Sequence, residues 1–466
     1  MNKDGKSDSV VVPKRLSNNG MFSQVAAETA EERTLAMGNF IQHSRLQTQS
    51  WEGLSLVRER IRQSARRDRK QKFKSLWHHI YSVDQLRQSY FSSKRKAAAG
   101  ADRVTWECYG EELEVRLADL SQRLRSGSYR APPVARVFIP KVDGGERPIG
   151  IPALEDRIEQ RRVAQVLELI YETEFKGFSY GFRPKRGAHN ALDALKVGIE
   201  RRKINWILDA DLQKFFDTIC RDWLIRFLEH RIADKRVIRQ IREWLTAGVV
   251  ENSIMLYLEA RAPQGGSIYP LLANIYMHYV FDLWVEQWRN RSATGDIIVV
   301  RYADDFVVGF ERQSDASRFI KELYTRLQRF HLHLNAQKTR LIEFGRYAIE
   351  QRKRKGLSKT ETFDFLGFTH ILSITRIGWF AVLRKPTRKR VNDKLKELNR
   401  ELKWGRHVPI RDMGKWLNAV IRGWYQYYAA PKTFHVLNAF RRRLARLCGT
   451  ELLNVRVSVQ KSLGSR

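Results

Sequence analysis

The chain has 466 residues, and its 85 lysines and arginines outnumber 51 aspartates and glutamates, which leaves a formal net charge of +34. That length is too great for one ordinary hydrophobic core and predicts two to four domains or subdomains. The excess positive charge favours a polyanionic partner, most commonly nucleic acid. An anionic membrane surface is disfavoured because the basic segments alternate with aromatics and carry no lipidation motif. A merely basic, soluble enzyme remains the alternative.

Three cysteines, Cys108, Cys220 and Cys448, lie far apart and form no CxxC pair. The sequence therefore predicts neither a disulfide framework nor a zinc site. No apolar run approaches the ~20 residues of a membrane span, and the N-terminus lacks the apolar core of a signal peptide. We expect a soluble, intracellular protein that keeps its thiols reduced.

The N-terminal part of the chain is polar and then strongly basic. Residues 1–50 are rich in Ser, Asn, Gln and Glu and predict a flexible or partly helical lead-in. The stretch LVRERIRQSARRDRKQKFKSLWHHIY (56–81) predicts one basic amphipathic helix, with nine Lys/Arg and two Asp/Glu between positions 58 and 74. Its charged face is either simply solvated or a nucleic-acid contact, and the sequence favours neither.

The middle of the chain reads as hairpins and helices. ARVFIPKVDGGERPIGIPA (135–153) predicts a β-hairpin around a DGG turn, and LEDRIEQRRVAQVLELIYETEF (154–175) predicts a helix. INWILDADLQKFFDTI (204–219) predicts a buried strand that runs into a helix, and residues 297–310 predict a pair of strands. Residues 382–447 are helical in pattern, with 18 Lys/Arg against four Asp/Glu.

Acidic residues stand at the ends of two of these apolar strands. The strand at Trp206–Leu208 presents Asp209 and Asp211 on one face, because strand side chains alternate. In VVRYADDFVVGF (299–310), Asp304 and Asp305 lie between two apolar runs, where like charges repel and resist burial. Each acid alone would more often be a turn or cap residue. Together they predict a site for a hard divalent cation, which prefers oxygen ligands and assists displacement at phosphorus.

The segment Tyr302–Asp305 reads YADD and matches the YxDD box of reverse transcriptases. The chain as a whole resembles the reverse transcriptase/maturase proteins of bacterial group II introns over residues 60–447. The segments that carry the resemblance, in chain order, are RPIGIPALEDRIEQRRV (147–163, fingers hairpin and helix), FSYGFRPKRGAHNAL (178–192, SYGFRP signature), DADLQKFFDTI (209–219, motif A), APQGGSIYPLLANIYMH (262–278, motif B), LNAQKTRLIEFG (334–345, Asn and Lys-Thr motif), FDFLGF (363–368, primer grip) and IRGWYQYYA (421–429, maturase or thumb element).

The resemblance implies an α+β fold of the right-hand polymerase type, with fingers and palm built on an antiparallel sheet and a helical thumb/maturase domain. The expected divisions are a polar extension at 1–50, a basic helical extension and start of fingers at 51–134, a fingers-palm domain at 135–370, a thumb/maturase domain at 371–447 and a tail at 448–466.

The resemblance also implies roles for particular residues. Asp211, Asp304 and Asp305, with Leu212 in the same metal set, would hold two Mg²⁺ ions, for which Mn²⁺ could substitute. Lys338 would act as general acid toward the departing pyrophosphate. The substrate-binding set comprises Lys141, Arg147, Phe216, Gln264, Gly265, Tyr302, Asn335, Leu366 and Gly367.

Some of these residues have a stated task. Lys141 and Arg147 would clamp the triphosphate, since Arg offers a bidentate fork and Lys a point charge. Phe216 would exclude a 2′-hydroxyl, and Gln264 and Gly265 would lie close to the nascent base pair. Without the resemblance, the same residues would read as exposed hairpin charges, a core aromatic and a simple turn.

The basic C-terminal segment carries aromatics that either build a core or stack on nucleotides, and core is the favoured interpretation. These are Trp416, Trp424, Tyr425, Tyr427 and Tyr428. His331 and His333 alternate, but no third metal ligand accompanies them.

Three features depart from the family pattern. Tyr269 replaces the usual Ser of motif B and is bulky near the nucleotide site, and Arg103 in GADRVT (100–105) replaces a Gly of a G-x-D-G pattern. After residue 447 no Cys/His-rich HNH segment is recognisable. We therefore expect no target cleavage by this chain, so that mobility would use existing DNA 3′ ends.

The expected function is that of an RNA-directed DNA polymerase that binds its group II intron RNA, assists splicing and makes cDNA during retrohoming. The expected partners are intron RNA or another RNA template, a DNA primer or target and dNTPs; no membrane is expected, and a homodimer remains open. The expected location is the bacterial cytoplasm, with the nucleoid or a ribonucleoprotein. The alternatives are a reverse transcriptase recruited to defence or DNA repair, and a maturase that acts in splicing only.

Overall fold

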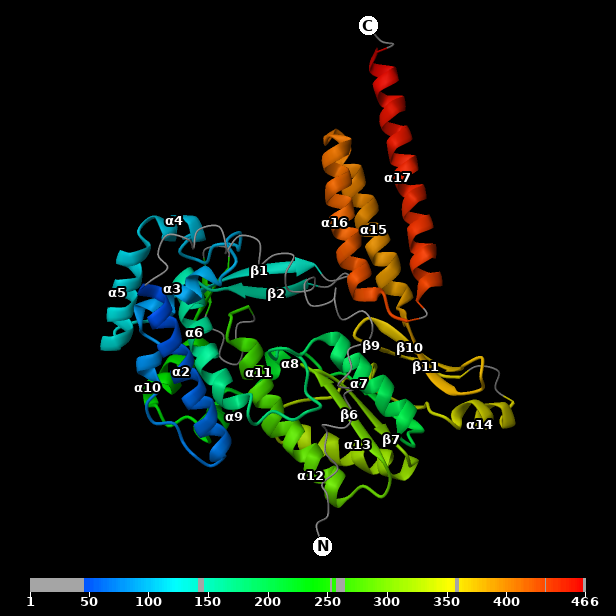
Figure 1. Ribbon diagram of the computed structural model, residues 1–466, viewed down its shortest axis with the longest axis horizontal. Coiled ribbons are helices and arrows are strands. Elements are labelled where there is room, and N and C mark those ends of the chain that lie inside the picture. Colours follow the sequence, from blue (N-terminus) through cyan, green and yellow to red (C-terminus); the bar gives the residue numbers. More distant parts are fainter. Residues whose placement is uncertain are drawn as a thin grey trace.

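The computed structural model describes residues 46–140, 146–251, 254–256, 265–356, 360–431 and 433–463. The fold is a mixture of helices and sheets, as predicted. Figure 1 shows a lobe of N-terminal helices, a central sheet covered by helices, and three C-terminal helices that project away from the sheet. No helix in the described part of the chain combines the length and apolarity that a membrane span requires.

The helical lobe is organised around α6 (Leu154–Tyr171), which is buried along most of its length and packs against α2 and α3. This helix confirms the prediction for 154–175. The other helices of the lobe are α2 (Leu46–Arg67), α3 (Val83–Phe91), α4 (Trp106–Glu111), α5 (Leu113–Ser126), α9 (Arg221–Glu229) and α10 (Lys235–Thr246).

The prediction of one continuous basic helix over 56–81 is wrong beyond Arg67. The Asp68 carboxylate accepts a hydrogen bond from the Lys70 N–H at 2.8 Å, which favours a turn over a further helical turn. The amides of Leu76 and Trp77 then donate to Asp234 at 2.8 and 2.9 Å. Because Asp234 is more than 150 residues away in sequence, this break was not visible in the local pattern.

The predicted hairpin is confirmed as β1 (Val134–Pro140) and β2 (Glu146–Ile151). They form a sheet with β4 (Val249–Glu251) and β5 (Ile254–Leu256) in the order β2-β1-β4-β5, in which β1 and β4 are parallel. Figure 1 shows the hairpin reaching out of the helical lobe toward the C-terminal helices.

The central sheet has the order β6-β7-β3-β8 and is antiparallel throughout. Its strands are β3 (Trp206–Ala210), β6 (Ile297–Tyr302), β7 (Asp305–Phe310) and β8 (Arg340–Glu343). The predicted strand at 204–210 and the predicted pair at 297–310 are therefore confirmed. The helix expected after β3 is also present as the short α8 (Phe215–Thr218).

Both faces of the central sheet are buried, against different partners. Leu208 and Phe306 belong to the core shared with the helical lobe, α11 (Tyr269–Met277) and α13 (Gln313–Gln328). Ile207 and Val307 belong to a second core, shared with α7 (Ala188–Arg201) and the C-terminal elements. Strand residues alternate between the two cores because successive side chains point to opposite faces. Between α11 and α12 (Leu283–Arg291) lies one π-helical turn, η3 (His278–Asp282).

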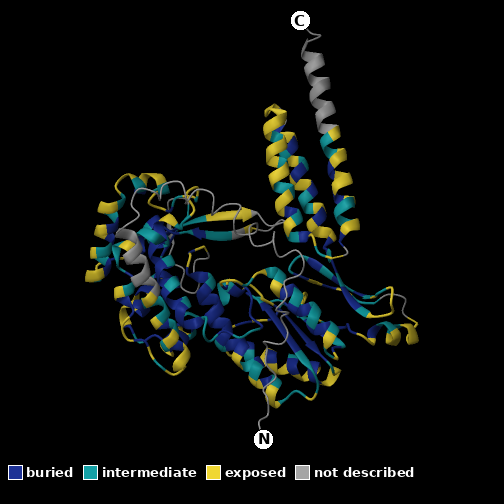
Figure 2. Cartoon of the chain, viewed as in Figure 1, coloured by how far each residue is buried: buried dark blue, intermediate teal, exposed yellow. Residues whose placement is uncertain are grey.

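The C-terminal part begins with the short helix α14, forms a small antiparallel sheet, β11-β10-β9, and continues as three long helices. Its elements are α14 (Ala348–Arg354), β9 (Phe363–Phe365), β10 (Phe368–Ile374), β11 (Phe380–Pro386), α15 (Arg388–Trp404), η4 (Gly405–His407), α16 (Ile410–Tyr428) and α17 (Phe434–Leu463). Figure 2 shows that much of the surface of α15 and α16 is exposed.

The core interpretation of the C-terminal aromatics is confirmed for two of them. Trp424 and Tyr428 are buried, and Trp424 stacks on Phe440 with ring centroids 4.1 Å apart. Tyr425 and Tyr427 are half-buried, whereas Trp416 is exposed. The aromatics therefore tie α16 to α17 rather than forming a continuous exposed stacking surface.

Two carboxyl groups are buried inside the helical lobe. Asp156 accepts hydrogen bonds from the Tyr129 hydroxyl at 2.8 Å and the Trp244 ring N–H at 3.3 Å. Burial raises the pKa of Asp156 to about 7, although these hydrogen bonds oppose the shift. Burial, followed by the neighbouring Asp156 and Glu243 charges, also raises the pKa of Glu159 well above its usual range. The native lobe therefore retains protons that the unfolded chain releases.

This retention predicts a stability that falls with rising pH. The unfolded pKa of Asp156 lies near 3.9, so its contribution is fully present below about pH 4 and is lost as pH rises through about 7. Asp156→Asn keeps an acceptor for Tyr129 but cannot ionise. In urea denaturation between pH 5 and 8, the variant should gain free energy of unfolding relative to the wild type, by up to about 3 kcal/mol. The same pH dependence of the free energy of unfolding in both proteins would contradict this account.

Candidate polymerase site

The acidic residues predicted from sequence gather at one end of the central sheet. Tyr302 and Asp305 are the last pair of the β6–β7 ladder, so Ala303 and Asp304 form a two-residue turn, with Ala303 at φ 57°. On the other side of β7, Ala210 pairs with Phe306, which places Asp211 one step beyond, alongside Asp305. By strand alternation Asp305 shares the face of Val307, and Asp211 shares the face of Ile207. The two carboxylates therefore project to the same side of the sheet.

The pKa values show how close these carboxylates are. Burial, and then the charges of Asp304, Asp211 and Asp209, raise the pKa of Asp305 to about 7, while Lys338 opposes the rise. Burial also raises the pKa of Asp209 to about 6, although Arg340, 3.6 Å away, opposes it. The site thus holds several carboxyl groups close together, near the cations of Lys338 and Arg340.

The turn that follows His333 presents a lysine to this cluster. The Asn335 N–H donates to the Asp211 carbonyl at 2.8 Å, and its side-chain oxygen accepts from the Gln337 N–H at 3.2 Å. These bonds fold the chain back, so that the Lys338 ammonium lies 2.8 Å from Asp211 Oδ2. Lys338 remains mostly exposed on its open side. The Asn335 turn therefore positions the Lys338 side chain, and its exposed ammonium can contact a ligand that enters from solvent.

Two further predicted residues flank Asp211 along the chain. Leu212 is buried and forms a bridge with Leu334, so any contribution to a metal would come from its backbone. In α8, Phe215 is buried in the core whereas Phe216 is only half-buried and makes an edge contact with Phe215. Phe216 packs against the same core with part of its side chain exposed, so its predicted contact with the sugar stays a prediction.

Leu366 and Gly367 form a tight turn between β9 and β10, both with positive φ (48° and 78°). That pair of angles fits a two-residue hairpin loop. The Tyr427 hydroxyl donates to the Leu366 carbonyl at 2.9 Å, so α16 holds the turn from behind. The Tyr427 pKa is raised to about 12 by burial and by the nearby Tyr428 and Tyr302 hydroxyls, which places this junction beside the YADD hairpin.

Gly265 has a φ of 132°, and a Cβ there would lie 1.9 Å from the Gly150 carbonyl oxygen. The glycine therefore permits the start of α11 to approach the β1–β2 hairpin. Lys141 and Gln264 lie outside the described residues, as does the side chain of Arg147. The backbone of Arg147, on β2, pairs with Ile139 of β1. Their predicted contacts stay predictions.

The structure places both substituted family positions. Tyr269 is buried, and its hydroxyl donates to the Trp244 carbonyl at 3.0 Å, so the ring turns into the helical lobe. Arg103 has a φ of 57°, a left-handed conformation that glycine adopts without strain. The Tyr269 substitution is thus absorbed by the core, and the Arg103 substitution carries local backbone strain.

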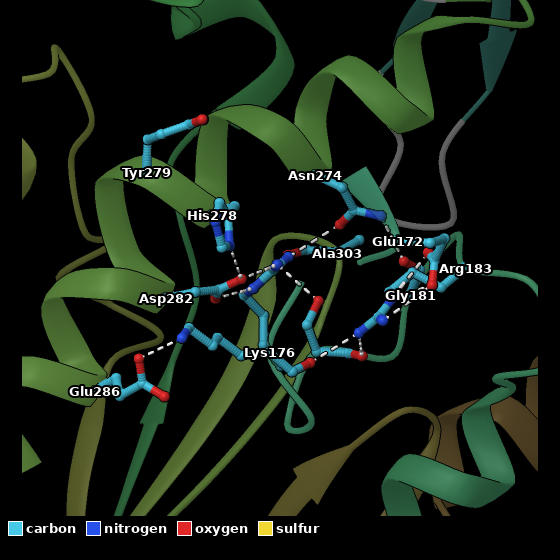
Figure 3. A network of polar contacts seen from close by, with 12 residues as sticks. Glu172, Lys176, Gly181, Arg183, Asn274, His278, Tyr279, Asp282, Glu286 and Ala303 are labelled. Atoms are coloured by element: carbon cyan, nitrogen blue, oxygen red, sulfur yellow. Dashed lines mark hydrogen bonds and ion pairs between the residues drawn. The ribbon is translucent and has the colours of Figure 1, made fainter. Parts of the chain in front are cut away.

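Sequence reasoning missed the residues beneath the turn. Arg301 of β6 donates hydrogen bonds to Asp282 and to Asn274, both labelled in Figure 3. Asn274 lies within the motif B segment but was given no role, and Asp282 lies outside every motif. The one available signal was a charged residue inside the apolar run VVRY. Across the described ranges, no three Asp, Glu, His or Cys side chains are already arranged to hold a metal ion.

Asp304 and Asp305 therefore lie on a hairpin beside Asp211, which follows the neighbouring strand β3. Comparison with known proteins identifies the class of protein. Residues 139–370 match the family of reverse transcriptases (RNA-dependent DNA polymerases), and residues 388–453 match the group II intron maturase-specific domain.

Similar proteins are found in several organisms. Protein YkfC of Escherichia coli K12 is 33% identical over 306 residues, which are 57% of this chain and 79% of that protein. The group II intron-encoded protein LtrA of Lactococcus lactis is 33% identical over 226 residues, 48% of this chain and 37% of LtrA. A 91 kDa protein in the cob intron of Schizosaccharomyces pombe is 30% identical over 251 residues, 53% of this chain and 31% of that protein.

The chain therefore belongs to the reverse transcriptase/maturase family of group II introns, and its enzyme class is RNA-directed DNA polymerase. It spans most of YkfC but only about a third of LtrA and of the S. pombe protein.

Proposed function

We propose that this chain copies RNA into DNA by template-directed nucleotidyl transfer. Its elements would form a right hand: the helical lobe with the β1–β2 hairpin as fingers, the central sheet as palm and α15–α17 as thumb. The divisions near residues 134, 370 and 447 are part of this proposal. The observation that supports it is that Asp304, Asp305 and Asp211 lie together at one end of the sheet. The Lys338 ammonium lies 2.8 Å from Asp211 Oδ2.

The donor set fits divalent metal. Carboxylate oxygens are the ligands that Mg²⁺ prefers. Burial raises the pKa of Asp305, and the neighbouring carboxylates Asp304, Asp211 and Asp209 raise it further, so a bound cation would compensate their charge. Asp211, Asp304 and Asp305 would hold two Mg²⁺ ions, or Mn²⁺ in their place, with the Leu212 carbonyl adjacent. When bound, the metal would activate the attacking oxygen and stabilise the departing one.

The remaining residues would bind and orient the reactants. The primer 3′-oxygen attacks the α-phosphorus of the dNTP, a new P–O bond forms and the bond to pyrophosphate breaks. Lys338 would give a proton to the pyrophosphate, and Phe216 would lie against the sugar. Tyr302 and the Leu366–Gly367 turn would support the primer end. Gly265, together with Lys141, Arg147 and Gln264, would enclose the triphosphate and the nascent pair.

We further propose that the RNA partner is a group II intron, and that the protein assists its splicing and returns it to DNA by retrohoming. The match of residues 388–453 to the maturase-specific domain supports this, as do relatives whose names place them in introns. The exposed basic residues of α2 and α15–α17 would bind the intron through its phosphates.

Primer extension tests the polymerase. Purified protein is mixed with an RNA template, an annealed DNA primer, Mg²⁺ and dNTPs, and the products are sized. Full-length cDNA supports the proposal, whereas tight RNA binding without any extension would replace it with a splicing-only role.

Splicing of a precursor that contains the intron RNA flanking the coding region, with and without protein, tests the maturase role. An unchanged splicing rate would favour a reverse transcriptase outside intron biology.

A further inference from the structure

The side chain of Arg301 is completely buried and makes five hydrogen bonds. Its Nε donates to Asp282 Oδ1 at 2.7 Å, and its Nη2 donates to Asp282 Oδ2 at 2.6 Å. The other three run to Asn274 Oδ1 at 3.1 Å, the Ala303 carbonyl at 2.8 Å and Ser179 Oγ at 2.7 Å. A guanidinium has five N–H groups, so every donor of Arg301 is used.

The network lies on the face of the sheet opposite to the carboxylates. Arg301 pairs with Phe306, which belongs to the core shared with α11 and α13, whereas Tyr302 pairs with Asp305 and faces the other side. Arg301 therefore reaches the YADD turn from below, through the Ala303 carbonyl. That carbonyl belongs to the peptide bond that leads into Asp304, so its orientation fixes the direction in which Asp304 and Asp305 leave the turn.

Each partner of Arg301 is itself held in place (Figure 3). Asp282 ends the π-helical turn η3, and His278 lies one turn earlier with its Nδ1 3.8 Å from Asp282 Oδ2. Burial raises the pKa of the Asp282 carboxyl, but the charge and hydrogen bonds of Arg301, with the nearby His278, outweigh it and hold the pKa below its ordinary value. Arg301 and Asp282 therefore form an ion pair. The π-helical turn η3 sets the position along the helix from which Asp282 reaches Arg301.

The segment Phe178–Phe182 closes the network from the remaining side. The Arg301 N–H donates to the Phe178 carbonyl at 2.9 Å, and the Tyr180 N–H donates to the Arg301 carbonyl at 2.8 Å. Asn274 donates to the Gly181 carbonyl at 2.7 Å, and a Cβ on Gly181 would lie 2.3 Å from the Ala303 nitrogen. The turn thus rests on the backbone of Gly181, and Asn274 bridges that support to Arg301.

We propose that Arg301 is a positioning residue for the polymerase site, and that it orients the Asp304 and Asp305 carboxylates by holding the Ala303 carbonyl from the buried side of the sheet. Asp282, Asn274 and Ser179 fix the guanidinium for this task. Arg301 touches neither substrate nor metal. The proposal rests on the proposed polymerase function, but the placement of the carboxylates is measurable without DNA synthesis.

The first variant is Arg301→Lys. An ammonium keeps the charge beside Asp282 but has three donors and no planar fork, so it cannot bind Asp282 bidentately and also hold Ala303. We expect kcat of primer extension to fall about 100-fold, because small misplacements of reacting groups have effects of that size. The KM for dNTP and the Kd for RNA should stay within about threefold, since neither ligand contacts Arg301. Mn²⁺ binding, followed by electron paramagnetic resonance, should weaken by about tenfold.

A double variant separates positioning from stability. Arg301→Met with Asp282→Leu removes both buried charges together, which is often neutral or favourable for folding. We expect it to recover more thermal stability than Arg301→Met alone and yet to keep the low kcat. Recovery of kcat together with stability would overturn the proposal and leave the network a purely structural role.

The matched control is Arg231→Lys, at a second buried arginine, which pairs with Glu174 and with the Arg69 carbonyl in the helical lobe. This variant should lose stability without a change in kcat. An equal loss of kcat from Arg231→Lys, or unchanged kcat and Mn²⁺ affinity in folded Arg301→Lys, would overturn the proposal. Absence of cDNA from the wild type would instead contradict the polymerase function, and Mn²⁺ affinity would then decide the positioning role alone.

Discussion

Replacement of Asp304 and Asp305 by alanine should abolish DNA synthesis and leave RNA binding intact. The two residues stand at the tip of the β6–β7 hairpin, beside Asp211, and burial, followed by the charges of Asp304 and Asp211, raises the pKa of Asp305 to about 7. If these carboxylates hold the metal ions, their removal takes away several kcal/mol of transition-state stabilisation, and the extension rate should fall at least about 1,000-fold. Primer extension on an RNA template measures this rate directly.

The matched control removes another adjacent acidic pair. Glu111 and Glu112 are exposed at the end of α4, far from the central sheet in Figure 1, and Glu111→Ala/Glu112→Ala changes the net charge by the same amount. This control should extend primers at the wild-type rate. Both double variants should bind RNA within about twofold of the wild type or slightly more tightly, because each loses two negative charges. Residual full-length cDNA from Asp304→Ala/Asp305→Ala would show that the polymerase site lies elsewhere.

RNA affinity should fall steeply with salt. The chain carries a net charge of +34, and basic side chains are exposed along α15, α16 and α17. A protein that makes six to ten phosphate contacts loses roughly 1,000-fold or more in affinity between 50 and 200 mM salt, because bound counterions are released. We expect a loss of that order, measured by filter binding or fluorescence anisotropy against a fixed RNA. A shallow slope would argue against an extended basic surface.

A pair of variants locates the surface. Arg441 and Arg442 are exposed on α17, and Arg441→Ala/Arg442→Ala should reduce the slope of log K against log salt by about two. Lys321 and Arg329 are exposed at α13, which lies at the opposite end of the molecule in Figure 1. Lys321→Ala/Arg329→Ala carries the same loss of charge and should leave the slope nearly unchanged. Equal effects of the two pairs would mean that the charge acts as a diffuse field.

Much of the local structure could be predicted because it depends on residues close together in the chain. Short continuous apolar runs placed β3, β6 and β7, and the DGG turn placed the β1–β2 hairpin. The periodicity over 154–175 gave α6. The same short-range reading failed at Asp68, where the helix ends and the following amides bind Asp234 from a distant segment. The helix propensity of this segment was overridden by the hydrogen bonds to Asp234, which is too distant in the sequence for a local pattern to include.

The candidate site divides in the same way. Sequence by itself determined the class of the protein and its acidic residues, because adjacent carboxylates at strand ends and the YADD turn are local features with one common chemistry. Only the tertiary structure decided that Asp211 lies beside Asp305, that Tyr269 turns into the core and that Arg301 donates to the Ala303 carbonyl in the turn. These depend on strand register and on side chains from segments up to about 120 residues apart meeting in a buried space. Such pairings are set by packing, which a linear pattern does not record.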